Sequence, residues 1–155
     1  MRALGHADRA LDLGCGDGRL SAELDATELT ASDVSATALE RARRRLPVAR
    51  IVELEPDVPL PFDDGAFDLV LCAETIEHVR DVQLLVSEVR RVLRPGGLFA
   101  VTTPANLPVG RRPDPRSPHL RFFTRRSLRR MLGELGFEVE SLRRRSGTLL
   151  ARANR

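Results

Sequence analysis

A glycine-rich stretch near the N-terminus, which reads L-D-L-G-C-G-D-G over residues 11–18, constrains the fold of this chain more than any other segment. The apolar residues 10–13 precede three glycines at alternate positions, and a helical mixture of polar and apolar residues follows at 19–24. Glycine adopts positive φ angles readily and lets a ligand approach the bare backbone. The stretch therefore predicts a buried strand, a ligand-binding loop and a helix whose first N–H groups are unpaired.

The spacing of the glycines argues against a nicotinamide dinucleotide as the ligand. The dinucleotide fingerprint is G-x-G-x-x-G, whereas the sixth position counted from Gly14 is Arg19. Asp12, inside the predicted strand, would repel a pyrophosphate but attract an ammonium group. A cationic amino-acid ligand therefore fits this loop better.

The same stretch resembles the first motif of class I S-adenosylmethionine-dependent methyltransferases, in which an acidic residue precedes L-G-x-G-x-G. Other segments resemble this family too, namely F-D-L-V at residues 67–70, L-R-P-G-G-L at 93–98 and H-x-x-x-F-T at 119–124. The resemblance covers residues 8–153 and implies a Rossmann-like fold with S-adenosyl-L-methionine as the cofactor. It also implies in-line transfer of the sulfonium methyl group to a nucleophile, for which the protein mainly orients the two reactants.

Acidic residues are placed to hold such a cofactor. Asp33 lies nineteen positions after the first glycine, at the end of the second predicted strand, where it can accept both ribose hydroxyls. Capping of the next helix is the alternative role, but Ser35 is also available for it. The resemblance implies that an acid in the proline-rich segment 55–62 accepts from the adenine amino group. Asp57 is the better match and Glu55 the reserve, with an acid in a surface turn as the alternative. The residues expected to contact the cofactor are Asp12, Gly14, Cys15, Gly16, Gly18, Asp33, Val34, Asp57, Val58, Ala73 and Glu74.

The chain as a whole predicts one α/β domain over residues 1–155. Predicted strands and helices alternate up to the fifth strand, which favours a mostly parallel, seven-stranded sheet with helices on both faces. A β-hairpin that turns at residues 146–147 is expected to end the chain. The predicted strands are 10–13, 28–32, 49–54, 67–73, 98–102, 137–142 and 148–153, and the predicted helices are 19–24, 36–46, 82–93 and 125–135.

The proline-rich segment 103–118 predicts a long loop at the edge of the sheet where ligands bind. About nine residues precede the first predicted strand, where members of the family usually have a segment that covers the cofactor. We therefore expect the site to be open, covered by the 106–120 loop, or completed by another subunit, with a homodimer left open. His78 and His119 are the candidates for taking a proton from the acceptor, and packing roles for both are the alternative.

The second half of the chain is strongly basic. Residues 106–155 carry 13 arginines against 4 acidic residues, whereas residues 1–105 carry 12 against 18. This charge favours an anionic acceptor, attracted by arginines near His119, namely Arg111, Arg112, Arg116 and Arg121. The resemblance to methyltransferases that act on small molecules implies that this acceptor is a small metabolite. An RNA methyltransferase is an alternative, but this half has few aromatic side chains for stacking on nucleic-acid bases. A non-catalytic module that binds S-adenosylmethionine is the other alternative.

Several classes of protein are disfavoured by the composition. Cys15 and Cys72 are too few for a disulfide framework and indicate reduced thiols in the cytoplasm. No apolar run approaches the length of a membrane span. We also expect no metal, because the sequence shows no group of His, Cys and Asp with the spacing of metal ligands.

Overall fold

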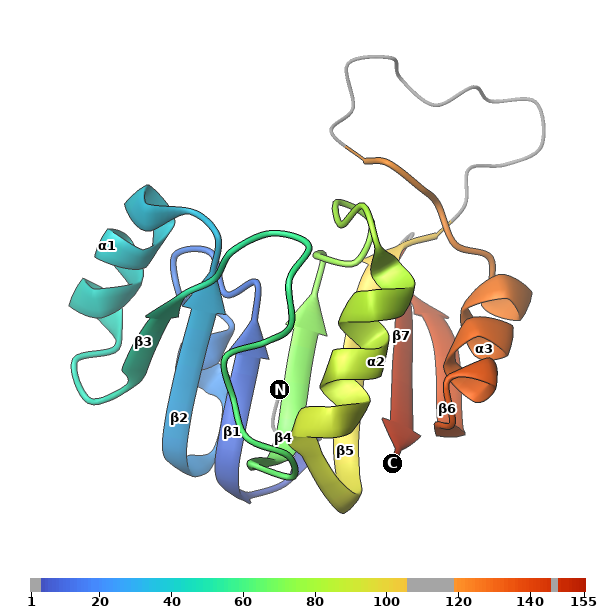
Figure 1. Ribbon diagram of the computed structural model, residues 1–155, viewed down its shortest axis with the longest axis horizontal. Helices are drawn as coiled ribbons and strands as arrows, with labels where there is room; N and C mark the ends of the chain where they lie inside the picture. The colour runs from blue at the N-terminus through green and yellow to red at the C-terminus, as the bar shows by residue number, and fades with distance from the viewer. Residues whose placement is uncertain (1–3, 106–118, 146–147) are drawn as a thin grey trace.

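Seven strands form one sheet in the computed structural model, which describes residues 4–105, 119–145 and 148–155. Their order across the sheet is β3-β2-β1-β4-β5-β7-β6 (Figure 1). The first five strands are parallel, and β7 is antiparallel to both of its neighbours. The strands are β1 (Ala7–Leu13), β2 (Ala26–Asp33), β3 (Arg50–Glu53), β4 (Phe67–Ala73), β5 (Leu93–Pro104), β6 (Glu138–Arg145) and β7 (Thr148–Asn154). This confirms the predicted Rossmann-like sheet with a C-terminal hairpin. Apart from its last two residues, the expected 106–120 loop lies outside the described residues.

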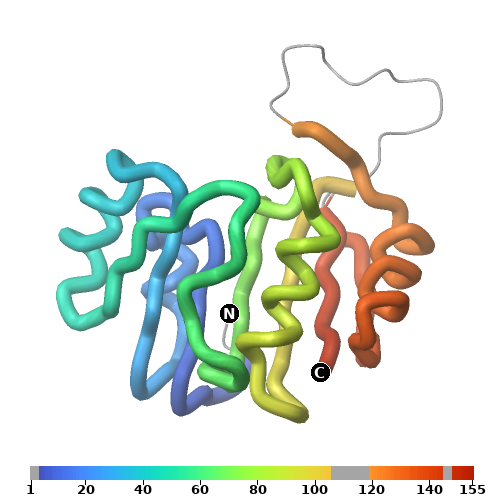
Figure 2. Tube along the Cα trace, viewed as in Figure 1, coloured from blue at the N-terminus to red at the C-terminus, as the bar shows by residue number. Residues whose placement is uncertain are grey.

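Helices cover both faces of the sheet, as predicted. The helices are α1 (Ala36–Arg45), α2 (Val82–Val92) and α3 (Arg125–Glu134). Val86 of α2 belongs to the same buried cluster as Leu11, whereas Leu39 of α1 packs with Ala31. Ala31 is in register with Asp12, and neighbouring residues of a strand point to opposite faces. α1 therefore lies on the face opposite to α2, while α2 and α3 run side by side across the other face (Figure 2).

Side-chain caps fix the starts of the three helices. The Ser35 hydroxyl accepts from the Ala38 N–H at 3.3 Å, and Thr124 forms a reciprocal capping box with Ser127. The Asp81 carboxylate caps α2. The cap for which Ser35 was available is thereby confirmed. Each helix follows the carboxyl end of a strand, so these caps determine where the chain turns back from that edge of the sheet.

The helix predicted at residues 19–24 is wrong. Only a short 3-10 helix, η2 (Ser21–Glu23), is present, with no side-chain cap. Gly18 has a φ of +80°, outside the helical range, and only seven residues separate it from β2. No helix N-terminus therefore follows the glycine loop, and the loop itself has to supply the N–H groups that the helix was expected to offer.

The start of β5 also differs from the prediction. Leu93 pairs with Phe67 and Leu98 with Leu69, so four residues of β5, 94–97, lie opposite the single residue Asp68 of β4 and three of them are additional. The strand predicted to start at residue 98 thus starts at Leu93 and contains an irregularity, with Gly96 at a φ of +75°. α2 passes into the strand without a separate loop.

Candidate functional site

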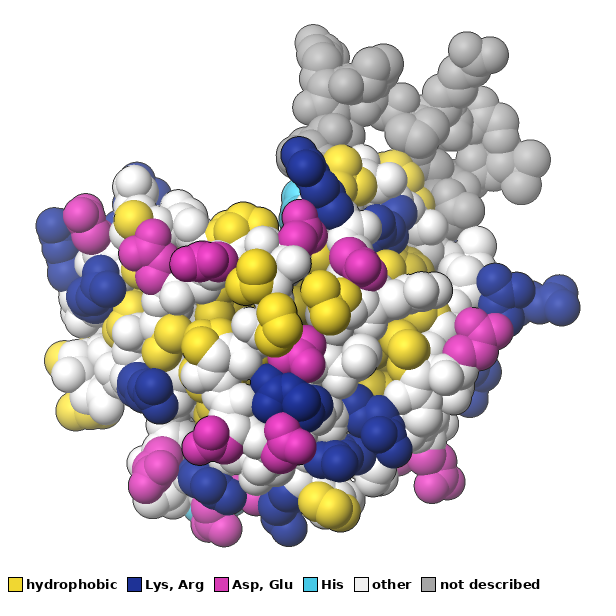
Figure 3. Space-filling model, viewed as in Figure 1, with side chains coloured by type: hydrophobic (Ala, Val, Ile, Leu, Met, Phe, Trp, Pro, Cys, Tyr) yellow, Lys and Arg dark blue, Asp and Glu magenta, His cyan; other side chains and the backbone are white. Residues whose placement is uncertain are grey.

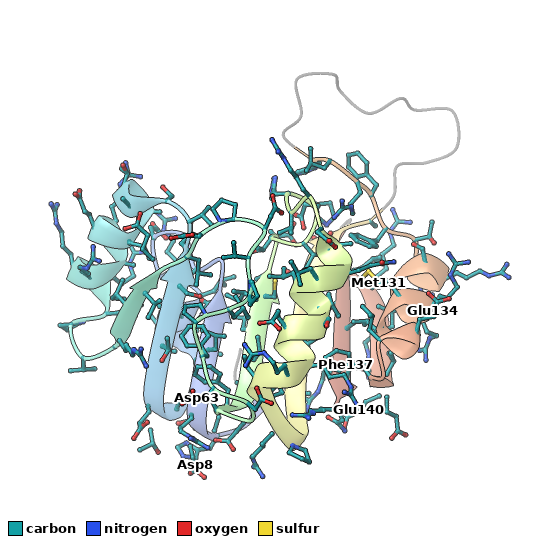
Figure 4. The ribbon with its side chains drawn as sticks, in the orientation of Figure 1. Asp8, Asp63, Met131, Glu134, Phe137 and Glu140 are labelled. Atoms are coloured by element: carbon teal, nitrogen blue, oxygen red, sulfur yellow. The ribbon has the colours of Figure 1, made fainter. Side chains whose placement is uncertain are left out.

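A cavity of about 720 Å³ opens at the edge of the sheet where β1, β2, β3 and β4 end. This edge is the usual ligand site of open α/β sheets, and the volume lies in the range of small-molecule sites. The segment 54–60 and the first turns of α2 form its outer wall. Figure 3 shows apolar side chains interspersed with acidic ones over this part of the molecule. Figure 4 places Asp8 and Asp63 at the opposite edge of the sheet.

Most of the residues predicted to contact the cofactor line this cavity. They are Gly14, Gly16, Asp33, Val34, Asp57, Val58 and Glu74, together with His78 from the predicted catalytic pair. The other predicted site residues do not line the cavity, namely Asp12, Cys15, Gly18, Ala73 and His119.

The three glycines of the loop have left-handed backbones for different reasons. A Cβ on Gly14 would lie 2.4 Å from the Thr75 hydroxyl oxygen, and one on Gly18 would lie 2.9 Å from Leu46. Both positions are therefore filled by the protein itself. A Cβ on Gly16 would meet no atom within 4 Å, and Gly16 lines the cavity with a φ of +55°. Gly16 is thus the position where the backbone is left open toward a ligand.

Asp33 ties the glycine loop to the start of α1. Its Oδ2 accepts from the Gly16 N–H at 2.8 Å, and its Oδ1 accepts from the Ser35 N–H at 2.9 Å. Each carboxylate oxygen can accept more than one hydrogen bond. The carboxylate is therefore fixed in orientation at the cavity wall and still able to accept from two hydroxyl groups.

The proline-rich segment above the cavity is held by two residues of α2. Glu88 Oε2 accepts from the Leu60 N–H at 2.8 Å, and Arg91 donates to the carbonyls of Leu60 and Phe62 at 2.9 and 2.8 Å. Arg91 also donates to both oxygens of Glu88, at 2.9 and 2.7 Å, and to Asp64. These bonds hold the pKa of the Glu88 carboxyl below its ordinary value. The segment is thereby fixed over the cavity although it has no regular secondary structure.

Among the described residues, two other than glycine have left-handed backbones, and both line the cavity. Asp57 has a φ of +59° and Glu74 a φ of +51°. Such conformations cost free energy and are concentrated at functional sites. Burial raises the pKa of the Glu74 carboxyl, although the Thr102 hydroxyl donates to it at 2.9 Å.

Asp12 and Cys15 lie behind the loop. Asp12 is 1% exposed and accepts from the Ser21 hydroxyl at 2.6 Å, and burial raises its pKa to about 6. Burial also raises the pKa of the Cys15 thiol to about 12, so this thiol stays protonated near neutral pH. Neither side chain faces the cavity in this structure, so an effect of either on a ligand has to pass through the loop.

The two candidate catalytic histidines lie against each other although 41 positions separate them. Their ring centroids are 4.8 Å apart, at an interplanar angle of 64°. The buried Glu77 lies beside them, with its Oε1 4.0 Å from His78 Nε2. Its Oε2 accepts from the Thr103 hydroxyl at 3.0 Å. The structure thus brings a carboxylate and two histidines together, and His78 is the member of this group that lines the cavity.

Arg121, expected to attract an anionic acceptor, is hydrogen-bonded to the protein's own backbone in the structure. Its guanidinium donates to the backbone carbonyls of Ile76, Val79 and Arg80. It therefore joins the segment after the long loop to the turn between β4 and α2. The arginines at 111, 112 and 116 lie outside the described residues.

Sequence reasoning missed the apolar wall of the cavity. This wall includes Leu13, Leu54, Val79, Leu84 and Leu85. Leu84 and Leu85 occupy the first turns of α2, whose apolar stripe is visible in the sequence. Only the fold indicates that one end of this stripe extends past the sheet and borders the cavity.

The sequence of this chain is similar to sequences of known proteins. Residues 11–101 match a family model described as a methyltransferase domain. A probable S-adenosylmethionine-dependent methyltransferase of Mycolicibacterium smegmatis is 36% identical over 136 residues, covering 84% of this chain and 52% of that protein. A ubiquinone biosynthesis O-methyltransferase of Chelativorans sp. is 37% identical over 108 residues, covering 61% and 40% of the two chains. The chain thus spans about half the length, or less, of these relatives.

A solved structure has the same fold along nearly the whole chain. It is an S-adenosylmethionine-dependent methyltransferase from Mesorhizobium loti, with a TM-score of 0.78 and 24% identity. The match covers 99% of this chain and 95% of that one. None of the described helices has the length and apolar character needed to cross a lipid bilayer.

Proposed function

We propose that this chain, which belongs to the class I S-adenosylmethionine-dependent methyltransferases, transfers a methyl group from S-adenosylmethionine to a small, anionic metabolite. S-adenosylmethionine, when bound, supplies an electrophilic methyl group on a sulfonium centre. The observation that carries the proposal is the open backbone at Gly16 directly beside the Asp33 carboxylate, at one end of the cavity. A small acceptor fits the size of the cavity better than a macromolecule does.

The residues of the cavity fit the chemical groups of this cofactor. Asp33 would accept from the ribose hydroxyls, with its orientation fixed by the loop. Asp57 would accept from the adenine amino group, and the apolar Leu54 and Val58 would border the adenine ring. The backbone at Gly16 leaves room for the amino-acid part. Asp12, Cys15, Gly18 and Ala73 support the loop and strands behind these groups.

The other end of the cavity would receive the acceptor. His78 lines it there, and Oε1 of the buried Glu77 carboxylate lies 4.0 Å from its Nε2. His78 is therefore the group placed to take a proton from an acceptor hydroxyl, and His119 is placed to orient it. Leu84 and Leu85 line the cavity as well and would give the space between the two reactants an apolar border.

Calorimetry of S-adenosylmethionine binding to Asp33→Ala tests the cofactor end. Loss of a charged acceptor of hydrogen bonds should remove about 1.5–3 kcal/mol of binding free energy, which is roughly a ten- to hundredfold loss of affinity. Asp17→Ala is the matched control, because Asp17 belongs to the same loop but pairs with Arg19 and Arg45 away from the cavity. Equal affinities in the two variants would remove Asp33 from the site.

The acceptor is identified by S-adenosylhomocysteine formation with a panel of hydroxylated, carboxylated metabolites. Turnover with a member of this panel supports the proposal. Turnover with RNA fragments alone would replace it with the nucleic-acid alternative. The complete absence of turnover, with the cofactor bound, would favour a binding module.

A further inference from the structure

We propose that Glu77, His78 and His119 bind a divalent transition-metal cation, with zinc as the best-suited ion, at the acceptor end of the cavity. One ligand atom from each residue lies within 4.8 Å of the other two. This site could not be predicted from the sequence, because the ligands come from two segments that only the fold brings together. The proposal thus departs from the expectation of no metal, which rested on the spacing of His, Cys and Asp in the sequence.

The buried carboxylate of Glu77 is the first observation that points to a cation. Glu77 is fully buried, and its Oε1 has no hydrogen-bond partner in the described part of the chain. A buried carboxylate oxygen without a partner costs free energy, and such atoms in native proteins call for an explanation. The other oxygen is oriented by the Thr103 hydroxyl at 3.0 Å, so Oε1 is held on the side of His78. A bound cation would satisfy this oxygen.

Backbone contacts hold His119 next to the other two ligands. The Leu120 N–H donates to the Glu77 carbonyl at 2.8 Å. Arg121 donates to the carbonyls of Val79 and Arg80, on the other side of the histidine at 78. The two segments that carry the ligands are therefore joined directly beside the proposed site, which reduces the entropy lost when a metal orders it.

The geometry requires only a modest contraction. Metal–ligand distances of about 2.0–2.1 Å place the ligand atoms of a tetrahedral zinc site about 3.3 Å apart. The longest separation in the cluster, at most 4.8 Å, can reach this value by rotation of the side chains. Two imidazoles and one carboxylate are a ligand set typical of catalytic zinc, which keeps a fourth position open.

The open position would face the cavity, because His78 belongs both to the cluster and to the cavity wall. A cation there would bind oxygen atoms of the acceptor and favour ionisation of a bound hydroxyl. With the cation present, its charge would replace His78 in promoting loss of the proton. This role of the ion rests on the proposed function, whereas the binding of the ion does not.

The test is a zinc titration of the metal-stripped protein against a chromophoric chelator, without cofactor or acceptor. His119→Ala should weaken zinc binding by more than about 100-fold, because changes outside the ligand shell alone cost about 10–100-fold. His6→Ala is the matched control, since His6 is the remaining histidine of the chain and bonds to Asp25 and Thr27 instead. Glu77→Gln tests the carboxylate with little change of shape and should also weaken binding.

The outcomes separate this inference from the proposed function. Failure of the wild type to take up one equivalent of zinc, or equal zinc affinities in His119→Ala and His6→Ala, would overturn the inference. Calorimetry with S-adenosylmethionine on the same samples is the independent readout. Zinc uptake without cofactor binding would overturn only the proposed function, and cofactor binding without zinc uptake would overturn only the metal site.

Discussion

Arg91→Leu is expected to destabilise the protein and to loosen the segment between β3 and β4 over the cavity. Arg91 joins α2 to this segment through the carbonyls of Leu60 and Phe62. It also neutralises Glu88, whose Oε2 accepts from the Leu60 N–H. Without the guanidinium, Glu88, which is 9% exposed, would keep its charge in a largely buried position. The substitution therefore removes both a cross-link and a counter-charge.

The free energy of unfolding should fall by about 3 kcal/mol. Removal of one partner from a buried ion pair costs about 3–5 kcal/mol, while a surface pair such as that of Arg91 with Asp64 contributes only about 0–1 kcal/mol. The lower end applies because the Arg91 side chain is 30% exposed. Folded domains have about 5–15 kcal/mol of stability, so the variant should still fold.

Urea unfolding of Arg91→Leu and Arg90→Leu measures this difference. Arg90, the neighbouring residue of α2, is exposed and makes one long hydrogen bond of 3.4 Å to the Gly136 carbonyl, so its loss should cost less than about 1 kcal/mol. Calorimetry should show weaker S-adenosylmethionine binding only for Arg91→Leu. Equal stability and equal cofactor affinity in the two variants would refute the reasoning.

Two further predictions concern the glycine loop and the strand behind it. Gly16→Val should abolish S-adenosylmethionine binding in a folded protein. Gly18→Val, with similar backbone strain, should mainly lower stability because its side chain would overlap Leu46. Normal cofactor binding by Gly16→Val in calorimetry would contradict the loop's role. Asp12→Asn should raise stability at pH 7 by about 2–3 kcal/mol, since burial raises the pKa of Asp12 to about 6 from an ordinary value of about 3.9. In urea unfolding this gain in stability should shrink as the pH falls from 6 to 4, because protonation of Asp12 then removes the buried charge from the wild type. A gain that does not depend on pH would contradict the prediction.

The regular elements were predictable where one physical signal dominated. The nearly continuous apolar run at Phe67–Ala73 predicts a buried parallel strand, and β4 has the same bounds. The apolar stripe from Val82 predicts α2, which ends one residue before the predicted end. The segment at 19–24, where a helix was predicted, is too short for periodicity to distinguish a helix from a turn. The left-handed backbone of Gly18 is incompatible with a helix that begins there.

The sequence predicted that Gly16 and Asp33 lie at one cavity, but not that the two histidines meet. The ends of β1 and β2 place Gly16 and Asp33 in contact, as the motif spacing implies. Alternation along β1 would also have shown that Asp12 faces away from its neighbours Leu11 and Leu13, which pack on the side of α2. No local pattern shows that a histidine at 119 contacts one at 78, because this contact depends on backbone hydrogen bonds between distant segments.

The strand order explains why the two halves of the site are separate. The order β3-β2-β1-β4-β5 reverses direction between β1 and β4, and ligands bind where loops diverge at such a reversal. Gly14, after β1, and Thr75, after β4, lie so close that a Cβ on the glycine would overlap the threonine hydroxyl. On one side of this contact the loops after β1, β2 and β3 provide the groups suited to the cofactor. On the other side the turn after β4 and the segment after β5 provide Glu77 and the two histidines. Substitutions in the second group should therefore change the choice of acceptor without changing cofactor affinity.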